Sequence, residues 1–481
     1  MLVRLSRNTI YRNINGHGYL TNQLNRHDQF FNELGTDFLN EIGRAPISVD
    51  SIVDKLYPLY CETVSKEEFT NDLLEFLNSL KEQDFVVCGD TPKDLDKQDK
   101  TFSYASGNPK SFITEIAENT GVSAMDLMSE LSKDRPRING LQFELTSQCN
   151  ERCIHCYIPN AKKNEGKGMP TEKVLSLIDE YSDMGGISVN LSGGEVFMHK
   201  DLIKIIQYCR EKDLQVNVLS NLIALRDSQI PYLKEANISM LQTSLYSMNP
   251  EIHDNITTIK GSFAKTKSAI EKLVAADIPV QISCPIMKAN KNSYKDVLQY
   301  AKKLDCKAQT DFIMMAQANL DTSNLANRIS LEETEKLIID IIENDVNYQQ
   351  AVLNLTSVKE IIKKDPDAFG KLNLCSAGSN ICCIAENGDV YPCPGWQDMI
   401  MGNVYEQSLK DIWEKSDKAK YLRSITQEMF PKCMNCDARD YCSPCLVRNY
   451  NENNGDMFKI TQHFCDVAFL TKRIVEDFLG H

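Results

Sequence analysis

The residues with the clearest chemistry are three cysteines, Cys149, Cys153 and Cys156, in the stretch Leu145–Tyr157. Their C-x3-C-x2-C spacing brings three thiolates to one face of a tight loop, directly after the strand-like run Leu141–Leu145. Iron–sulfur cubanes normally take four cysteines. Three leave one iron open, and an open metal position is where a small molecule binds and reacts, as at catalytic zinc sites. The alternative is a structural zinc loop with a distant fourth ligand, although zinc sites favour paired C-x2-C units.

The same spacing, with the aromatic Tyr157 after the last cysteine, resembles the motif of the radical S-adenosylmethionine (SAM) enzymes. The resemblance implies that the open iron chelates the amino and carboxylate groups of SAM. One electron then splits SAM into methionine and a 5′-deoxyadenosyl radical, which abstracts a hydrogen atom. Because the motif is short, the segments that follow have to agree with it.

The length and composition of the chain limit the class of protein to which this loop belongs. The chain has 481 residues, a net charge of −14 and 17 cysteines. A length of this order predicts roughly two to four domains, and the negative charge argues against a nucleic-acid partner. The N-terminus has no apolar signal-peptide core and the chain no run of about 18 apolar residues, so we expect a cytoplasmic protein without a membrane span. In such a chain, many cysteines favour metal ligation over disulfides.

Residues 136–320 alternate strand-like and helix-like segments. The strand candidates are 141–145, 187–191, 214–219, 238–245, 278–284 and 307–314. The helix candidates are 171–184, 200–212, 228–236, 262–276 and 293–304. Six βα-type units predict a parallel sheet with outer helices. Six units rather than eight fit a partial (β/α)6, TIM-like barrel of the α/β class, which the radical SAM resemblance also implies.

Polar motifs follow the first four of these strands. The cysteine loop follows the first, Ser192–Glu195 the second and Ser220–Asn221 the third, while Ser244 ends the fourth. In barrels built of βα units, chemistry lies on the loops after the strands. We therefore expect these four motifs to rim one face of the barrel.

The resemblance assigns most of these motifs to SAM. Gly193 and Gly194, which lack side chains, let the main chain approach the methionine part of SAM, and Glu195 lies near its amino group. The remaining polar residues match positions that contact the ribose or carboxylate of SAM, although each would serve equally as a strand-end cap: Ser220, Asn221 and Ser244. Related enzymes often have an arginine where this chain has Thr257, so no arginine is assigned to the SAM carboxylate.

Residues 1–100 are expected to form a separate domain. Short strand candidates lie at 9–14, 19–24 and 28–31, and a long helix is expected over Lys66–Glu82. A small sheet followed by helices resembles the winged-helix-like domain that binds leader peptides in ribosomal peptide-modifying systems; the alternative is a generic helical cap.

The segments between the domains are assigned from composition. Residues 89–112 have linker composition. We assign 101–135 to a linker and a bridging helix at 112–131, and 321–370 to a helical bridge.

Residues 371–481 form a second cysteine-rich region. Asn387-Gly388-Asp389 predicts a hairpin between two short strands, 381–385 and 390–391. The region resembles the SPASM domain, which in radical SAM enzymes holds two auxiliary 4Fe–4S clusters. By that resemblance one cluster takes Cys375, Cys382, Cys393 and Cys445, and the other takes Cys433, Cys436, Cys442 and Cys465. A zinc ribbon is the alternative, because C-x2-C pairs suit zinc.

Two details of this region depart from the family pattern. The last cysteine pair of the C-x2-C-x5-C-x2-C run is separated by two residues where the family usually has three. Cys383 is an extra thiol beside Cys382. We favour Cys382 as the ligand because it shares strand parity with the apolar Ile384.

Together these resemblances imply a radical SAM peptide maturase with three 4Fe–4S clusters, SAM, a ribosomally made precursor peptide and a flavodoxin- or ferredoxin-type reductant. The expected reaction is oxidative formation of cysteine thioethers, as in the sactipeptide and ranthipeptide maturases. Carbon–carbon or carbon–oxygen cross-linking, epimerisation and modification of a protein subunit remain alternatives. A non-catalytic iron–sulfur electron carrier is a further alternative, which Gly193–Glu195 argues against, since a carrier needs no SAM site.

Overall fold

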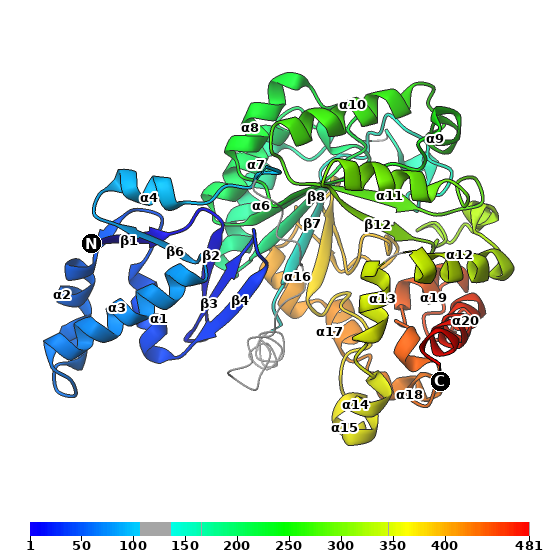
Figure 1. Ribbon diagram of the computed structural model, residues 1–481. Coiled ribbons are helices and arrows are strands. Elements are labelled where there is room, and N and C mark those ends of the chain that lie inside the picture. Colours follow the sequence, from blue (N-terminus) through cyan, green and yellow to red (C-terminus); the bar gives the residue numbers. More distant parts are fainter. Residues whose placement is uncertain (106–135, 165, 345, 481) are drawn as a thin grey trace.

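The computed structural model describes residues 1–105, 136–164, 166–344 and 346–480. Figure 1 shows an N-terminal region in blue at the left, a sheet covered by green helices in the centre, and an orange-to-red region at the lower right. The bridging helix expected at 112–131 lies outside the described residues. Within the described residues, no helix has the length and apolar character needed to cross a membrane.

The N-terminal region has a hydrophobic core of its own and two three-stranded antiparallel sheets, ordered β5-β1-β6 and β2-β3-β4. The strands are β1 (Leu2–Leu5), β2 (Thr9–Ile14), β3 (His17–Asn22), β4 (His27–Phe31), β5 (Ile47–Ser48) and β6 (Val86–Gly89). The helices are α1 (Glu33–Glu41), α2 (Val49–Tyr60), α3 (Lys66–Glu82) and α4 (Pro92–Gln98).

The predicted helix over Lys66–Glu82 is confirmed as α3. The Ser65 hydroxyl accepts a hydrogen bond from the Glu68 amide and so caps the first turn. Buried Phe69, Leu73 and Leu77 then recur at four-residue spacing and fix the face that packs on the sheet.

The linker expected over 89–112 is partly wrong, because it contains helix α4. Pro92 stands in the first turn, and Thr91 and Asp94 form a reciprocal capping box. Proline at the first helical position and a capping box both favour helix initiation. These local signals outweigh the polar composition of the segment.

The central sheet has nine strands in the order β12-β11-β10-β9-β8-β7-β13-β14-β15. The strands are β7 (Gly140–Glu144), β8 (Ser188–Ser192), β9 (Gln215–Leu219), β10 (Met240–Ser244), β11 (Val280–Pro285), β12 (Lys307–Asp311), β13 (Ile381–Ala385), β14 (Asp389–Tyr391) and β15 (Gly402–Asn403). The helices between the parallel strands are α6 (Thr171–Asp183), α7 (Leu202–Glu211), α8 (Ile230–Glu235), α9 (Pro250–Thr257), α10 (Ser262–Ala275) and α11 (Tyr294–Lys303).

This arrangement confirms the predicted α/β fold, with six parallel strands from β7 to β12 and helices packed outside them. Alternate strand residues such as Leu141, Phe143 and Val189 are fully buried in the layer between sheet and helices. Helix α9 was not predicted. It is a short helix whose N-cap is Asn249 and whose first residue is Pro250.

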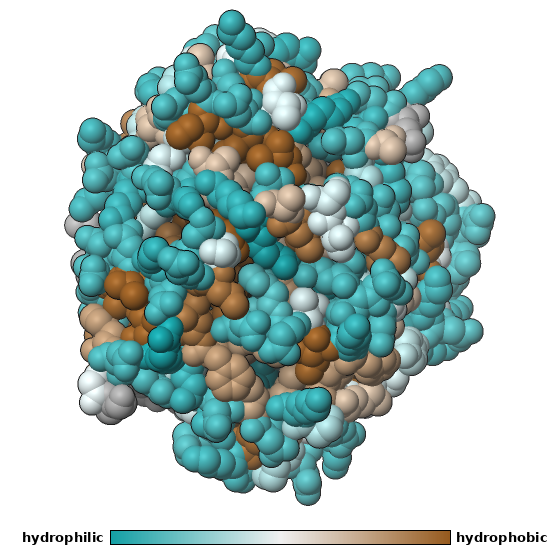
Figure 2. Space-filling model, turned by 90° about the vertical axis from the view of Figure 1, so that its right-hand side faces the viewer, coloured by the Kyte–Doolittle hydropathy of each residue, from teal (hydrophilic) through white to brown (hydrophobic). Residues whose placement is uncertain are grey.

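The C-terminal region is continuous with this core. Strand β13 pairs in parallel with β7 and antiparallel with β14, which confirms the predicted hairpin but places it in the barrel sheet. The helices of the bridge are α12 (Leu331–Asn344), α13 (Val346–Leu353), α14 (Val358–Lys364) and α15 (Pro366–Gly370). The last helices are α16 (Leu409–Lys415), α17 (Asp417–Arg423), α18 (Pro431–Met434), α19 (Leu446–Glu452) and α20 (Gln462–Leu479). Figure 2 views the side of α12 and α20, where apolar patches interrupt a mostly polar surface.

The N-terminal region rests on the turns that lead into the barrel strands. The Arg12 guanidinium donates to the carbonyl oxygens of Gly186 and Asp213, each at 2.8 Å. The Gln23 amide donates to the Asn237 carbonyl oxygen at 2.9 Å. These turns precede β8, β9 and β10, whereas the cysteine loop follows β7. The N-terminal region and the cysteine loop therefore lie at opposite ends of the parallel strands.

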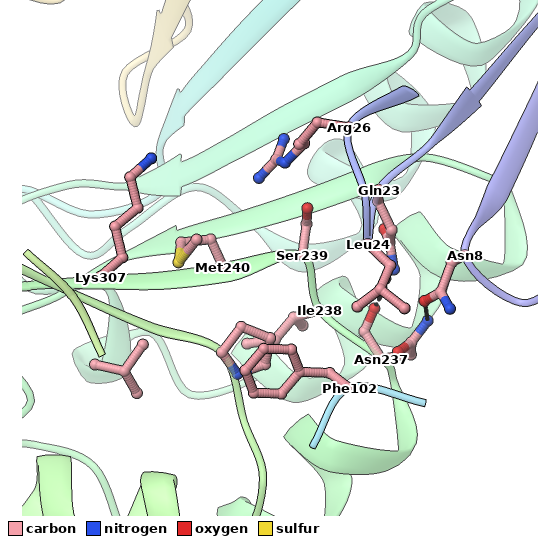
Figure 3. A pocket seen from close by; sticks show the side chains of 12 residues that line it. Asn8, Gln23, Leu24, Arg26, Phe102, Asn237, Ile238, Ser239, Met240 and Lys307 are labelled. Atoms are coloured by element: carbon pink, nitrogen blue, oxygen red, sulfur yellow. Dashed lines mark hydrogen bonds between the residues drawn. The ribbon is translucent and has the colours of Figure 1, made fainter. Parts of the chain in front are cut away.

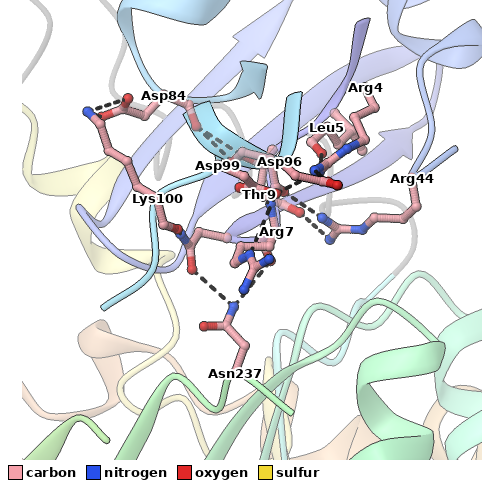
Figure 4. Close-up of polar contacts among 12 residues, drawn as sticks. Arg4, Leu5, Arg7, Thr9, Arg44, Asp84, Asp96, Asp99, Lys100 and Asn237 are labelled. Carbon is pink, nitrogen blue, oxygen red and sulfur yellow. Dashed lines mark hydrogen bonds and ion pairs between the residues drawn. The ribbon is translucent and has the colours of Figure 1, made fainter. Parts of the chain in front are cut away.

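The chain leaving the N-terminal region is fastened to that region's first strands. Figure 4 shows Asp99 beside Arg4, and the two form an ion pair of 2.7 Å. Asn8 donates to the Lys100 carbonyl oxygen at 2.7 Å and accepts from Asn237 of the barrel at 3.0 Å. The hydrogen bonds of Asn8 thus connect the chain that leaves the N-terminal region to the barrel.

Candidate active site

The three cysteines of the C-x3-C-x2-C motif lie on the loop after β7. Cys149 is buried, and Cys153 and Cys156 are half-buried. The loop is held from two sides, because Arg152 donates through its guanidinium to the Cys149 carbonyl oxygen at 2.8 Å, and Ile154 donates through its amide to the Ile256 carbonyl oxygen at 3.0 Å.

Gly193 and Gly194 pack their main chain directly on this loop. The Gly194 amide donates to the Thr146 carbonyl oxygen at 2.7 Å. A Cβ on Gly193 would lie 2.4 Å from that same oxygen, and a Cβ on Gly194 would lie 2.4 Å from the Gln148 carbonyl oxygen. Gly193 also has φ +150°, in the region that favours glycine. No side chain fits at either position, because the main chain of the cysteine loop lies too close. The expected approach of these glycines to SAM stays a prediction.

Glu195 joins the loops after β8 and β9. Its Oε1 accepts from the Ser220 hydroxyl at 2.7 Å and from the Phe197 amide at 2.9 Å, and its Oε2 accepts from the Asn221 amide at 2.8 Å. Burial raises the pKa of the carboxyl above its ordinary value. Both oxygens of the Glu195 carboxylate thus already accept hydrogen bonds from the protein. Contact of Glu195 with SAM stays a prediction.

The remaining predicted residues lie around the same rim. Asn221 also donates through its side chain to Asn150 in the cysteine loop, at 2.7 Å. Ser244 ends β10, and its side chain hydrogen bonds with Tyr246. The Tyr157 hydroxyl donates to Glu144 at 3.3 Å. The structure therefore brings the cysteine loop, Ser220, Asn221 and Ser244 together as expected.

Sequence reasoning missed two residues at this rim, the half-buried His155 and the buried Glu144. His155, between Cys153 and Cys156, is a lone histidine without a recognisable motif; burial lowers its pKa to about 4. Glu144 ends β7 with its carboxylate on the inner face, where it accepts from Tyr157 and, at 3.4 Å, from Gln397. Burial raises the pKa of Glu144 to about 7. A signal was available for Glu144, since it is a carboxylate at the end of a barrel strand.

Glu386 was also not selected, and no sequence motif marks it. It stands in the turn between β13 and β14, and its Oε2 accepts from the Ser147 amide at 2.8 Å and the Gly168 amide at 3.0 Å. Through this carboxylate the C-terminal hairpin holds the start of the cysteine loop.

The auxiliary cysteines form two groups. Cys375, Cys393 and Cys445 influence one another electrostatically: Cys445 and Cys375 both raise the pKa of the Cys393 thiol, after burial, which is the main cause. The four other predicted ligands line one cavity of about 740 Å³ beside α20: Cys433, Cys436, Cys442 and Cys465. That cavity also includes Cys445, so the two groups are neighbours.

The preference for Cys382 over Cys383 stays a prediction, but the facing of the two side chains does not favour it. Cys382 is paired in register with Leu141, and its thiol lies in the apolar layer between the sheet and the helices, where Arg423 is the charge that lowers its pKa. Cys383 faces the other way, and the charges that raise its pKa include Glu144 and Cys393. Parity with Ile384 marks the core-facing side of the strand, so the structure does not bring Cys382 together with the other three ligands.

The donor sets fit the groups that the motifs imply. The cysteine loop presents three thiols beside a main-chain cradle that only glycine can form, and the second region presents seven further clustered thiols in two groups. Among the residues that the structure describes, no three His, Cys, Asp or Glu side chains converge closely enough to hold a single metal ion. The fit therefore rests on loop geometry and thiol chemistry, not on a closed coordination shell.

Comparison with known families agrees with this geometry. The radical SAM superfamily matches residues 143–304, and SPASM, an iron–sulfur cluster-binding domain, matches residues 375–437. The chain thus contains a radical SAM domain and a SPASM domain and is an enzyme; the two domains imply 4Fe–4S clusters and SAM binding.

Relatives carry different activities. An AdoMet-dependent heme synthase of Methanosarcina barkeri is 27% identical and covers 66% of this chain and 92% of its own. The antilisterial bacteriocin subtilosin biosynthesis protein AlbA of Bacillus subtilis is 26% identical, over 65% of this chain and 68% of its own. Streptococcus suis SuiB bound to the precursor peptide SuiA has a similar fold, with a TM-score of 0.63 at 14% identity over 95% of this chain and 99% of SuiB.

Proposed function

We propose that this enzyme installs cysteine thioether cross-links in a ribosomally made precursor peptide. The observation that carries the proposal is the N-terminal region. The heme synthase similarity spans 66% of the chain, whereas the likeness to SuiB, crystallised with a precursor peptide, spans 95%. An added domain with its own core and its own exposed sheet edges suits a peptide that must be recognised apart from the reaction site.

The chain's own residues would divide the work as follows. A cluster at Cys149, Cys153 and Cys156 would, with SAM bound, supply the 5′-deoxyadenosyl radical. Gly193 and Gly194 keep the main chain close to that site. A carbon radical that bonds to a thiolate releases one electron, and the Cys375, Cys393 and Cys445 group would hold the acceptor. The third cluster would lie in the cavity lined by Cys433, Cys436, Cys442 and Cys465.

The leader segment of the peptide would bind the N-terminal region. The β2-β3-β4 sheet ends in β4, and an exposed edge accepts an extra strand through main-chain hydrogen bonds. A chain lacking residues 1–100 should keep its iron and its SAM cleavage but lose most binding of a fluorescein-labelled leader peptide. Equal anisotropy titrations with and without these residues would mean that the region only caps the barrel.

A heme-forming activity is the second candidate, because three heme synthases match at 24–27% identity. The reconstituted enzyme, with SAM and a flavodoxin or chemical reductant, should be given the cysteine-containing peptide encoded beside its gene. Loss of two hydrogen masses per cross-link, with the link located at cysteine by fragmentation, supports thioether formation. Two lost hydrogens with free thiols would indicate a carbon–carbon or carbon–oxygen link, and heme formation from an iron porphyrin precursor would favour the second candidate.

A further inference from the structure

Strand β12 has one long edge without a neighbouring strand among those described. It pairs in parallel with β11 over all five residues. The Asp311 carbonyl oxygen accepts from the Ile286 amide, so the odd-numbered residues of β12 turn their main-chain groups toward β11. Because main-chain groups alternate along a strand, the N–H and C=O groups of Ala308 and Thr310 point away from β11. Such an edge is a template for an added strand.

Every residue of this edge strand is at least partly exposed. Lys307, Gln309 and Asp311 are exposed and Ala308 and Thr310 are half-buried, whereas the paired residues of β11 are buried up to Cys284. Helices therefore cover the outer face of the sheet near β12 without closing off the strand's side.

The inner wall of the barrel carries many carboxamides, together with the charged side chains of Lys307, Asp311 and Glu144. Alternation places six carboxamides on the inner face, opposite the apolar layer: Gln142, Asn190, Asn217, Gln242, Gln281 and Gln309. Three of the six already hydrogen bond to neighbours: Asn217 donates to Asn190 at 3.0 Å, and Gln242 donates to Ser283 at 2.9 Å. A carboxamide both donates and accepts, which suits a peptide main chain whatever its side chains are.

The free edge of β12 begins beside the N-terminal region. Lys307, the first residue of β12, lines one cavity with Leu24 and Arg26, which belong to the turn between β3 and β4. Figure 3 shows Arg26 and Lys307 on either side of this cavity. A peptide leaving the N-terminal region there would meet the start of the β12 edge.

The chain that follows β12 lies between the two cysteine regions. Beyond β12 the chain crosses to the cysteine loop, where the Ala318 amide donates to the Tyr157 carbonyl oxygen at 2.9 Å. On the way it passes the auxiliary cysteines, since a Cβ on Gly395 would lie 2.6 Å from the Met315 methyl group. The segment that follows β12 thus contacts the cysteine loop next to Cys156 and the auxiliary region near Cys393.

We propose that the segment of the precursor between its leader and its modified residues binds as an added parallel strand along the free edge of β12. The inference rests on the proposed function, because the occupant is the precursor peptide. The direction follows from the leader entering at Lys307 and the core leaving toward Tyr157. Five strand residues span roughly 17 Å, so about five residues must separate the leader segment from the first modified residue.

Hydrogen exchange on the reconstituted wild-type enzyme tests this directly, with the synthetic peptide encoded beside the gene as the probe. Peptide binding should slow exchange of the Ala308 and Thr310 amides, while the Gln309 and Asp311 amides are already protected by β11. Unchanged exchange at Ala308 and Thr310 in the saturated complex would overturn the proposal.

Matched variants give an independent measure. Thr310→Pro removes one outward N–H, as edge strands tolerate, and Thr310→Ala keeps it. We expect Thr310→Pro to weaken peptide binding roughly two- to tenfold, the range of one main-chain hydrogen bond, and Thr310→Ala to bind as the wild type does. Iron content and unfolding midpoint check that both variants fold. Equal affinities would refute strand addition. Failure of the wild type to bind or modify the peptide would instead refute the proposed function.

Discussion

Replacing Glu386 by alanine tests whether the C-terminal hairpin controls the SAM site. The carboxylate accepts two main-chain amides, from Ser147 and Gly168. Hydrogen bonds to a charged group contribute about 1.5–3 kcal/mol each when buried, and Glu386 is only half-buried, so we take about 2 kcal/mol for the pair. Ser147 lies two residues before Cys149, and the neighbouring Thr146 holds the Gly194 amide.

The loss should therefore appear as weaker SAM binding. About 2 kcal/mol corresponds to roughly 30-fold in affinity, which is an upper limit because part of the loss lowers global stability instead. Anaerobic equilibrium dialysis with labelled SAM measures the affinity, and iron analysis controls for the clusters. Glu386→Gln keeps an acceptor oxygen and should recover most of the affinity. If Glu386→Ala binds SAM as tightly as the wild type, the coupling between hairpin and cysteine loop is refuted.

Three other changes have defined outcomes. Gly194→Ala should retain iron but lose SAM binding by calorimetry, because its Cβ would meet the Gln148 carbonyl oxygen; wild-type affinity would refute the cradle. Glu144 has its pKa raised from 4.5 to about 7 by burial, so its stabilising contribution is complete below about 4.5 and lost as pH rises through 7. Chemical unfolding should show the wild type losing about 1 kcal/mol relative to Glu144→Gln between pH 6 and 8; parallel curves would contradict this. Arg12→Ala should speed proteolysis of the N-terminal region without changing iron content, because it removes the bonds to Gly186 and Asp213; unchanged digestion would mean that other contacts suffice.

The sequence predicts those features that depend on local pattern. The alternation of apolar residues gives the six parallel strands, and the spacing of Phe69, Leu73 and Leu77 gives helix α3. The glycines of residues 193 and 194 are recognisable because their motif lies at a fixed place after a strand. Helix α4 shows that a capping box is a stronger signal than polar composition.

Features that depend on distant pairing are not predictable in this way. Nothing in residues 381–385 indicates that β13 joins β7, and without that pairing the facing of Cys382 and Cys383 cannot be assigned. Glu386 acquires its role only because the hairpin reaches the cysteine loop. The position of Glu144 at the end of a barrel strand is recognisable from the sequence, but its raised pKa results from burial in the folded chain.

The central claim is that Cys149, Cys153 and Cys156 form the site where SAM is cleaved. Iron and 5′-deoxyadenosine should be measured together, under reducing anaerobic conditions, in the wild type and in the triple cysteine-to-alanine variant. We expect about twelve irons per chain in the wild type, four for each of three clusters. The variant should keep about eight and form no 5′-deoxyadenosine. Continued 5′-deoxyadenosine formation by the variant, or zinc in place of iron in the wild type, would contradict the account.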